Sequence, residues 1–177
     1  MTWTTFHHRG EVLRTVTHTA DARRDGILPM DVPGVAETFG DELTLLGALQ
    51  LRWHTRLSGH IERELLKQPL DLDRAVIAAW HATADELPGT RAIMDHYRAE
   101  PLDEPMAFMT ATSAAKERVL LAAMAGRAGV DTTATAAAGR TLEDRARQTW
   151  TPTPARVGVA DHRGPGLLRR IRAHVAA

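Results

Sequence analysis

The sequence contains no cysteine. Disulfide bridges, thiolate nucleophiles and cysteine-bound zinc are therefore excluded. The lack of cysteine fits a reducing compartment, and we expect a cytoplasmic protein. A domain of this size buries roughly two-thirds of the surface of its unfolded chain, so its core needs no covalent support.

Long apolar runs are also absent. No segment approaches the roughly 18 uninterrupted apolar residues of a membrane span. The first residues, MTWTTFHHRGEV, lack the basic start and apolar stretch of a signal peptide, so we expect no membrane partner. Lysine is scarce as well, since only Lys67 and Lys116 accompany the many arginines. Together with abundant alanine, this usage is typical of a GC-rich bacterial genome.

The motifs of common catalytic and cofactor sites are missing. There is no phosphate-binding glycine loop, no dinucleotide fingerprint and no Gly-x-Ser-x-Gly around a nucleophilic serine. Glu-x-x-His, which helical bundles use for two-metal sites, does not occur either. The sequence therefore names no catalytic residue and leaves both the cofactor and the question of enzymatic activity open.

Most of the sequence shows helical periodicity, and almost no segment alternates apolar and polar residues with the period of two that is typical of a β-strand. We predict an all-α fold, an antiparallel helical bundle of four or five main helices within residues 1–150. The expected helices cover 6–24, 35–67, 71–87, 103–126 and 131–150, with caps at Asp71, Asp103 and either Asp131 or Thr132. Residues 151–177 follow as a Pro/Gly-rich linker and a basic, amphipathic C-terminal arm. Pro88 either kinks one helix or begins another.

The clearest pattern lies in residues 35–67. Its apolar side follows a 4-3-4-3 spacing, which is typical of a helix packed at a shallow angle against others. The positions are Phe39, Leu43, Leu46, Gln50, Trp53, Leu57, His60 and Glu64. Glu42 also falls on this side, whereas Arg52, Arg56 and Arg63 fall outside it.

Polar residues on the inward side of this helix are candidate ligands. His60 and Glu64 lie one turn apart, which permits either a shared metal or a mutual hydrogen bond. We expect Glu42, His60 and Glu64 to be the metal ligands if a metal is bound. Asp95 or His96 would join them if Pro88 turns its helix inward.

The predicted helix after Asp103 carries a face of mostly small residues. This face contains Phe108, Ala111, Thr112, Ala115, Val119, Ala122, Ala123 and Gly126. Small side chains allow a neighbouring helix to approach closely. We expect this face to be a packing surface.

Three functional hypotheses follow. The first is a non-catalytic helical interaction protein that forms homo-oligomers or binds a protein partner. The second is a bundle that binds a metal or small ligand through inward histidine and glutamate residues, either as a binding protein or as an enzyme. The third is a regulator that binds nucleic acid through the basic arm, which we favour least because no helix of the body presents a basic recognition face.

Overall fold

A computed structural model describes residues 3–152 of the protein, all of whose regular elements are α-helices. They are α1 (Trp3–Arg23), α2 (Val35–Phe39), α3 (Glu42–Lys67), α4 (Leu72–Glu86), α5 (Pro88–Ala99), α6 (Glu104–Met124) and α7 (Thr132–Thr149). The predicted all-α bundle is confirmed. It has six longer helices rather than four or five, because Pro88 begins a separate helix instead of kinking one.

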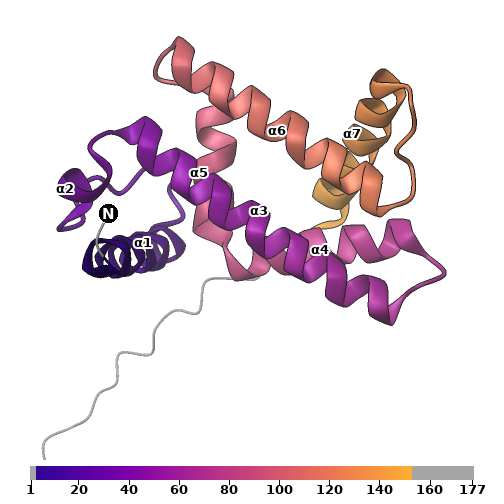
Figure 1. The fold of residues 1–177 in the computed structure, drawn as a ribbon, viewed down its shortest axis with the longest axis horizontal. Coiled ribbons are helices and arrows are strands. Elements are labelled where there is room, and N and C mark those ends of the chain that lie inside the picture. The colour runs from indigo at the N-terminus through magenta and orange to yellow at the C-terminus, as the bar shows by residue number, and fades with distance from the viewer. Residues whose placement is uncertain (1–2, 153–177) are drawn as a thin grey trace, which may run out of the picture.

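The helices pack mainly in pairs. α3 and α4 form an antiparallel hairpin, α6 packs on α7, and α1 packs on α5. The long helix α3 crosses the molecule, with α1 and α2 near one end and α4 near the other (Figure 1). α5 contacts α1, α3, α4 and α6 and so links the helix pairs to one another.

Local sequence signals set most helix boundaries. Asp71, Asp103 and Asp131 each accept a hydrogen bond from a backbone N–H in the first turn of α4, α6 and α7, as predicted. The expected helix over 35–67 is instead divided at Gly40, whose φ is +80°. Such a backbone conformation favours glycine, and Asp41 then caps α3 by accepting from the Thr44 N–H.

The core consists of two apolar clusters along α3. One gathers α1, α2, the first half of α3 and parts of α5 and α6, around Val16, Leu46 and Leu49. The other gathers the second half of α3, α4 and α7, around Trp53 and Trp80. No helix in the described range 3–152 is both long and apolar enough to cross a membrane.

The packing face predicted for α6 is wrong except at Ala122, which is buried. Phe108 is 74% exposed and Val119 is 47% exposed. The buried face instead carries Met106, Thr110, Ser113, Ala114, Glu117, Leu121 and Ala122. The periodicity did not favour this face because it places a carboxylate, Glu117, in the core.

Candidate functional site

The most unusual polar group of the core is Glu117, whose side chain is completely buried. Its two carboxylate oxygens accept hydrogen bonds from the indole N–H groups of Trp53 (3.1 Å) and Trp80 (3.0 Å). Arg91 Nη1 lies 3.6 Å from Glu117 Oε1. Burial of a charge is costly unless the charge is paired and hydrogen-bonded, and these three groups from α3, α4 and α5 supply both requirements.

Arg91 is equally enclosed, and only 2% of its side chain is exposed. Its guanidinium carbon lies 4.8 Å from the centre of the Trp53 ring and 5.8 Å from that of Trp80. A cation over the face of an aromatic ring is attracted by the π-electrons. The two tryptophans therefore hold both members of the Arg91–Glu117 pair.

A chain of ion pairs continues from Arg91 toward α7. Asp95, one turn after Arg91, accepts from Arg91 Nε at 3.1 Å. It also accepts two hydrogen bonds from Arg147, at 2.8 and 3.1 Å. This fork-like pairing fixes the orientation of both groups and ties α5 to α7. Asp95 is half-buried between α5 and α7, and 37% of its side chain is exposed.

Glu143 is the second buried carboxylate of this chain. It accepts from Arg98 on α5 at 2.7 Å, from Arg118 on α6 at 2.8 Å and from Arg147 at 3.0 Å. Burial alone would raise the pKa of Glu143, but the hydrogen bonds and charges of these arginines outweigh it and lower the pKa to about 2. Glu143 is therefore ionised at neutral pH.

This polar network links α3 to α7. Its buried carboxylates, Glu117 and Glu143, are engaged by indole or guanidinium groups. The sequence pattern contained a partial signal, because Arg91 with Asp95 and Glu143 with Arg147 are each four residues apart. The contacts between helices carried no such signal, since they join residues far apart in the chain.

The structure does not bring the predicted ligands Glu42, His60 and Glu64 together. Glu42 is exposed in the first turn of α3, contrary to its expected inward position, and lies about 27 Å along the helix from His60. His60 Nε2 instead pairs with Glu86 on α4 at 2.9 Å, and Glu64 accepts from Lys67 at 2.7 Å. Within residues 3–152, no three potential ligands are close enough to hold a metal ion, and metal binding stays a prediction from sequence.

The remaining candidates also have local partners or are exposed. His81 Nε2 of α4 lies 2.8 Å from the carbonyl oxygen of Ala146 on α7. Trp150, which follows α7, donates to Asp85 of α4 at 3.1 Å, so both contacts join α4 to the end of α7. The ring of His96 stacks edge-on against Tyr97. The basic arm falls beyond Pro152, outside the described residues, so its role in binding nucleic acid stays a prediction.

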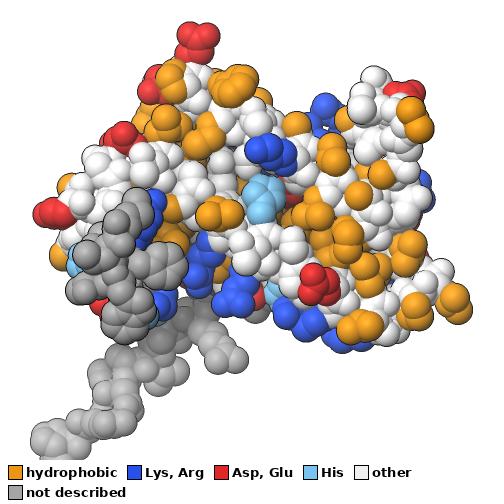
Figure 2. Space-filling model, in the orientation of Figure 1, with side chains coloured by type: hydrophobic (Ala, Val, Ile, Leu, Met, Phe, Trp, Pro, Cys, Tyr) orange, Lys and Arg blue, Asp and Glu red, His pale blue; other side chains and the backbone are white. Residues whose placement is uncertain are grey.

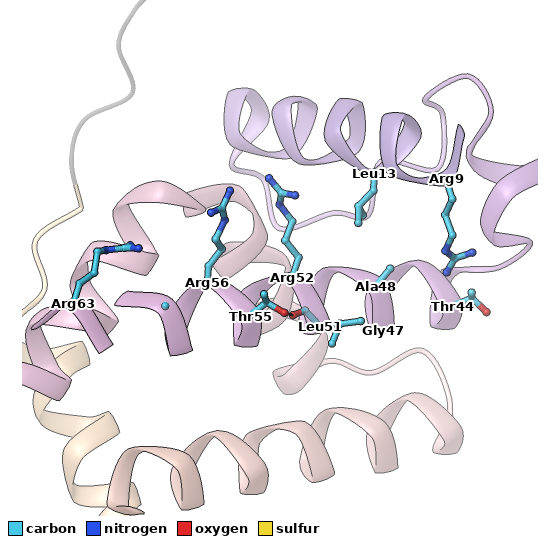
Figure 3. Close-up of a pocket in the computed structure, with 11 residues that line it drawn as sticks. Arg9, Leu13, Thr44, Gly47, Ala48, Leu51, Arg52, Thr55, Arg56 and Arg63 are labelled. Carbon is cyan, nitrogen blue, oxygen red and sulfur yellow. Dashed lines mark hydrogen bonds between the residues drawn. The ribbon is translucent and has the colours of Figure 1, made fainter. Parts of the chain in front are cut away.

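A groove between α1 and α3 forms a hollow of about 620 Å³ on the described surface. Four arginines line it, Arg9 from α1 and Arg52, Arg56 and Arg63 from α3, and none of the described lining residues is acidic. Leu13, Ala48, Leu51, Gly47 and Gly59 supply an apolar or side-chain-free floor. Figure 3 shows Arg52 and Arg56 extending side by side from α3, while Leu13 and Arg9 point from α1 toward it.

The arginines of this groove are only partly neutralised. Arg56 pairs with Glu86 at 3.1 Å, and Glu86 also pairs with His60. Arg63 donates to the His60 ring at 2.8 Å, and Arg9 donates to the carbonyl oxygen of Thr38 at 3.0 Å. The Nε atom of Arg52 is buried and has no hydrogen-bond partner in the described structure. The groove therefore holds an excess of positive charge beside apolar surface.

Comparison of the chain with protein families, with curated proteins and with solved structures finds no match in any of the three. The function must therefore be argued from the geometry of this molecule.

Proposed function

We propose that the protein is a non-catalytic interaction protein and that its groove between α1 and α3 binds an acidic, amphipathic helix of a partner protein. The observation that carries this proposal is the lining of the groove, in which four arginines border an apolar floor. Acidic side chains of the partner would face the arginines, and its apolar side chains would cover Leu13 and Leu51. Complementary charge of this kind accelerates association and selects the partner.

The dimensions of the groove suit a helix. Its lining on α3 runs from Thr44 to Arg63, which corresponds to about 28 Å of helix axis. Gly59 lines the groove and presents no side chain, and only the end of the Arg63 side chain lies within 4 Å of its Cβ position, so another helix can approach closely there. An amphipathic helix laid in an apolar groove is a recurrent mode of peptide recognition.

Two other occupants fit less well. Residues 153–177 carry five arginines and one acidic residue, so the chain's own C-terminal arm would be repelled by the groove. Nucleic acid would meet the arginines, but its phosphates would gain nothing from the floor around Leu13, Ala48 and Leu51.

A synthetic helical peptide with leucines on one face and glutamates on the other tests the proposal. We expect saturable binding to the full chain by fluorescence anisotropy, weakening as salt is raised, and binding at least about tenfold weaker for the same peptide with lysine in place of glutamate. The double variant R52M/R63M should lose about tenfold in affinity. Arg74→Met, which removes an exposed arginine of α4 outside the groove, should lose none.

Equal binding of the acidic and basic peptides would overturn the proposal, as would an equal effect of Arg74→Met. Tighter binding of a DNA duplex than of the acidic peptide, lost in R52M/R63M, would assign the groove to nucleic acid instead.

Self-association remains part of the proposal. Leu51 is 69% exposed and Phe108 is 74% exposed, on the same side of the bundle. Light scattering after size exclusion should give a mass above that of one chain. The double variant L51S/F108S should reduce that mass if this surface is the contact, whereas a monomeric wild type would exclude it.

A further inference from the structure

A second hollow, the α3–α6 cleft, lies where these two helices diverge and has a volume of about 510 Å³. It shares only Gly47 and Leu51 with the groove described above. Ligand pockets of about 300–1,000 Å³ are mostly apolar and contain a few polar groups that orient the ligand. Figure 2 shows a histidine side chain near the middle of the view, with hydrophobic side chains to either side of it and a basic side chain above it.

The apolar part of the α3–α6 cleft is formed by Leu51, Phe108, Met109 and Leu120. Most of the surface of Leu51 and Phe108 is exposed, although both are large hydrophobic residues. Both side chains line the cleft, so a hydrocarbon chain placed between them would contact both. The hydrophobic effect would favour such filling in proportion to the apolar area removed from water.

The polar part is rich in hydrogen-bond donors. Gln50 is only 6% exposed and lines the cleft. Its side-chain amide nitrogen can donate two hydrogen bonds to a ligand, and its oxygen can accept others. Lys116 adds an ammonium group at the rim, three residues after Ser113 on the same side of α6.

His54 and Ser113 join the two walls at this polar part. The Nε2 atom of His54 lies 3.0 Å from Oγ of Ser113. Burial lowers the pKa of His54, while the negative charge of Glu117 opposes that effect. A neutral imidazole at neutral pH can donate from Nε2 to the Ser113 oxygen, which leaves the serine hydroxyl hydrogen free to point into the cleft.

The arrangement fits binding better than acyl transfer by Ser113. Ser113 lies in the middle of α6, where neighbouring backbone N–H groups are used in the helix itself. A serine nucleophile requires donors aimed at the developing oxyanion, and such backbone groups are not available at this position.

We propose that the α3–α6 cleft binds an amphipathic monocarboxylate, a small molecule with a hydrocarbon chain and one carboxylate. The chain lies between Leu51 and Phe108. The carboxylate accepts hydrogen bonds from Gln50, Ser113 and Lys116. This ligand site shares Gly47 and Leu51 with the groove, but Gln50, Ser113 and Lys116 do not line the groove, and the inference does not rest on the partner helix.

Titration calorimetry with decanoate, below its micelle concentration, tests this inference on the full chain. We expect one saturable site, at least about tenfold weaker binding of decanol, and no detectable binding of acetate, which lacks the chain. Each methylene added between hexanoate and decanoate should strengthen binding by about fourfold. Equal affinity for decanol and decanoate would overturn the proposal, as would the absence of saturable binding.

Variants locate the ligand. Lys116→Met keeps most of the side-chain stem and removes the charge, so it should weaken decanoate about tenfold and leave decanol unchanged. Gln50→Leu, which is similar in size, should weaken decanoate several-fold without loss of thermal stability. The matched control is Lys67→Met, which removes the only other lysine and lies outside the cleft. A loss in Lys67→Met equal to that in Lys116→Met would place binding elsewhere and refute the site.

Discussion

Nε1 of Trp53 donates a hydrogen bond to Oε2 of Glu117 over 3.1 Å, although the two residues are 64 positions apart in the chain. The indole of Trp80 donates a second hydrogen bond to Glu117. Together the two hydrogen bonds stabilise the buried carboxylate and join α3 and α4 to α6. Few residue types can replace these three residues, because each buried indole N–H needs the Glu117 carboxylate as its acceptor.

Replacement of Glu117 should therefore be severely destabilising. Glu117→Ala leaves two buried indole N–H groups without their acceptor and removes the negative charge beside the Arg91 guanidinium, and we expect a loss of about 3–5 kcal/mol in the free energy of unfolding. Glu117→Gln retains an acceptor oxygen and should cost less, about 1–3 kcal/mol. Urea denaturation followed by tryptophan fluorescence measures both. Glu62→Ala on the exposed side of α3 serves as control and should change stability by less than about 0.5 kcal/mol; a Glu117→Ala variant as stable as this control would contradict the assigned role.

Stability should fall in acid because of Glu143. The pKa of this carboxyl is lowered from 4.5 to about 2 in the folded protein, so its stabilising effect is complete above pH 4.5 and is lost as the pH falls from there through about 2. The difference corresponds to about 3 kcal/mol. Arginine neighbours also lower the pKa of Asp95 against the opposing effect of burial, so Asp95 adds a loss of the same sign.

Unfolding curves at a series of pH values measure this effect. Glu143→Gln should be less stable at neutral pH and should show a flatter dependence on acid, whereas Asp144→Asn, its exposed neighbour, should retain the wild-type slope. An unchanged slope in Glu143→Gln would show that other groups control acid stability.

The contact between α6 and α7 should not tolerate a side chain at position 139. A Cβ atom at Gly139 would overlap the backbone of Arg118, and backbone cannot move aside as a flexible side chain can. We expect Gly139→Ala to destabilise the protein by about 2 kcal/mol or more despite the higher helix propensity of alanine. Gly129→Ala is the matched control, because nothing lies within 4 Å of its Cβ position. Differential scanning calorimetry should show a clear fall in Tm for the first variant and little change for the second.

The cap of α6 provides a local test. The Asp103 carboxylate accepts from the Met106 N–H at 2.8 Å, and Asp103→Ala should cost about 1 kcal/mol. Asp103→Asn or Asp103→Ser should recover most of that loss, since both residues can cap a helix. Failure of both to recover stability would mean that the charge of Asp103, rather than its hydrogen bond, is what matters.

Residues such as Asp103 also show what the sequence could predict. Caps, proline positions and apolar spacing act over a few residues, so the helix positions and the all-α class followed from them. The break at Gly40 was missed because the apolar spacing continues across it from Phe39 to Leu43. The role of Glu117 was missed for a different reason: its burial depends on tryptophans of α3 and α4, and nothing in the local sequence encodes that meeting.

The expected ligand set illustrates the same limit. Position on a helical wheel placed Glu42, His60 and Glu64 on one side of α3, but a wheel discards distance along the axis. Conversely, Arg52, Arg56 and Arg63 were correctly expected outside the core, yet only the approach of α1 shows that they line a groove.

The alternating arginines and carboxylates that join α5, α6 and α7 have a further consequence. Removing any one of these helices would leave buried charges on the other two without partners. Partial opening of this region therefore costs nearly as much free energy as opening all of it. Amide hydrogens of Asp95, Glu117 and Glu143 should accordingly exchange with solvent at similar, slow rates and mark a single cooperative unit.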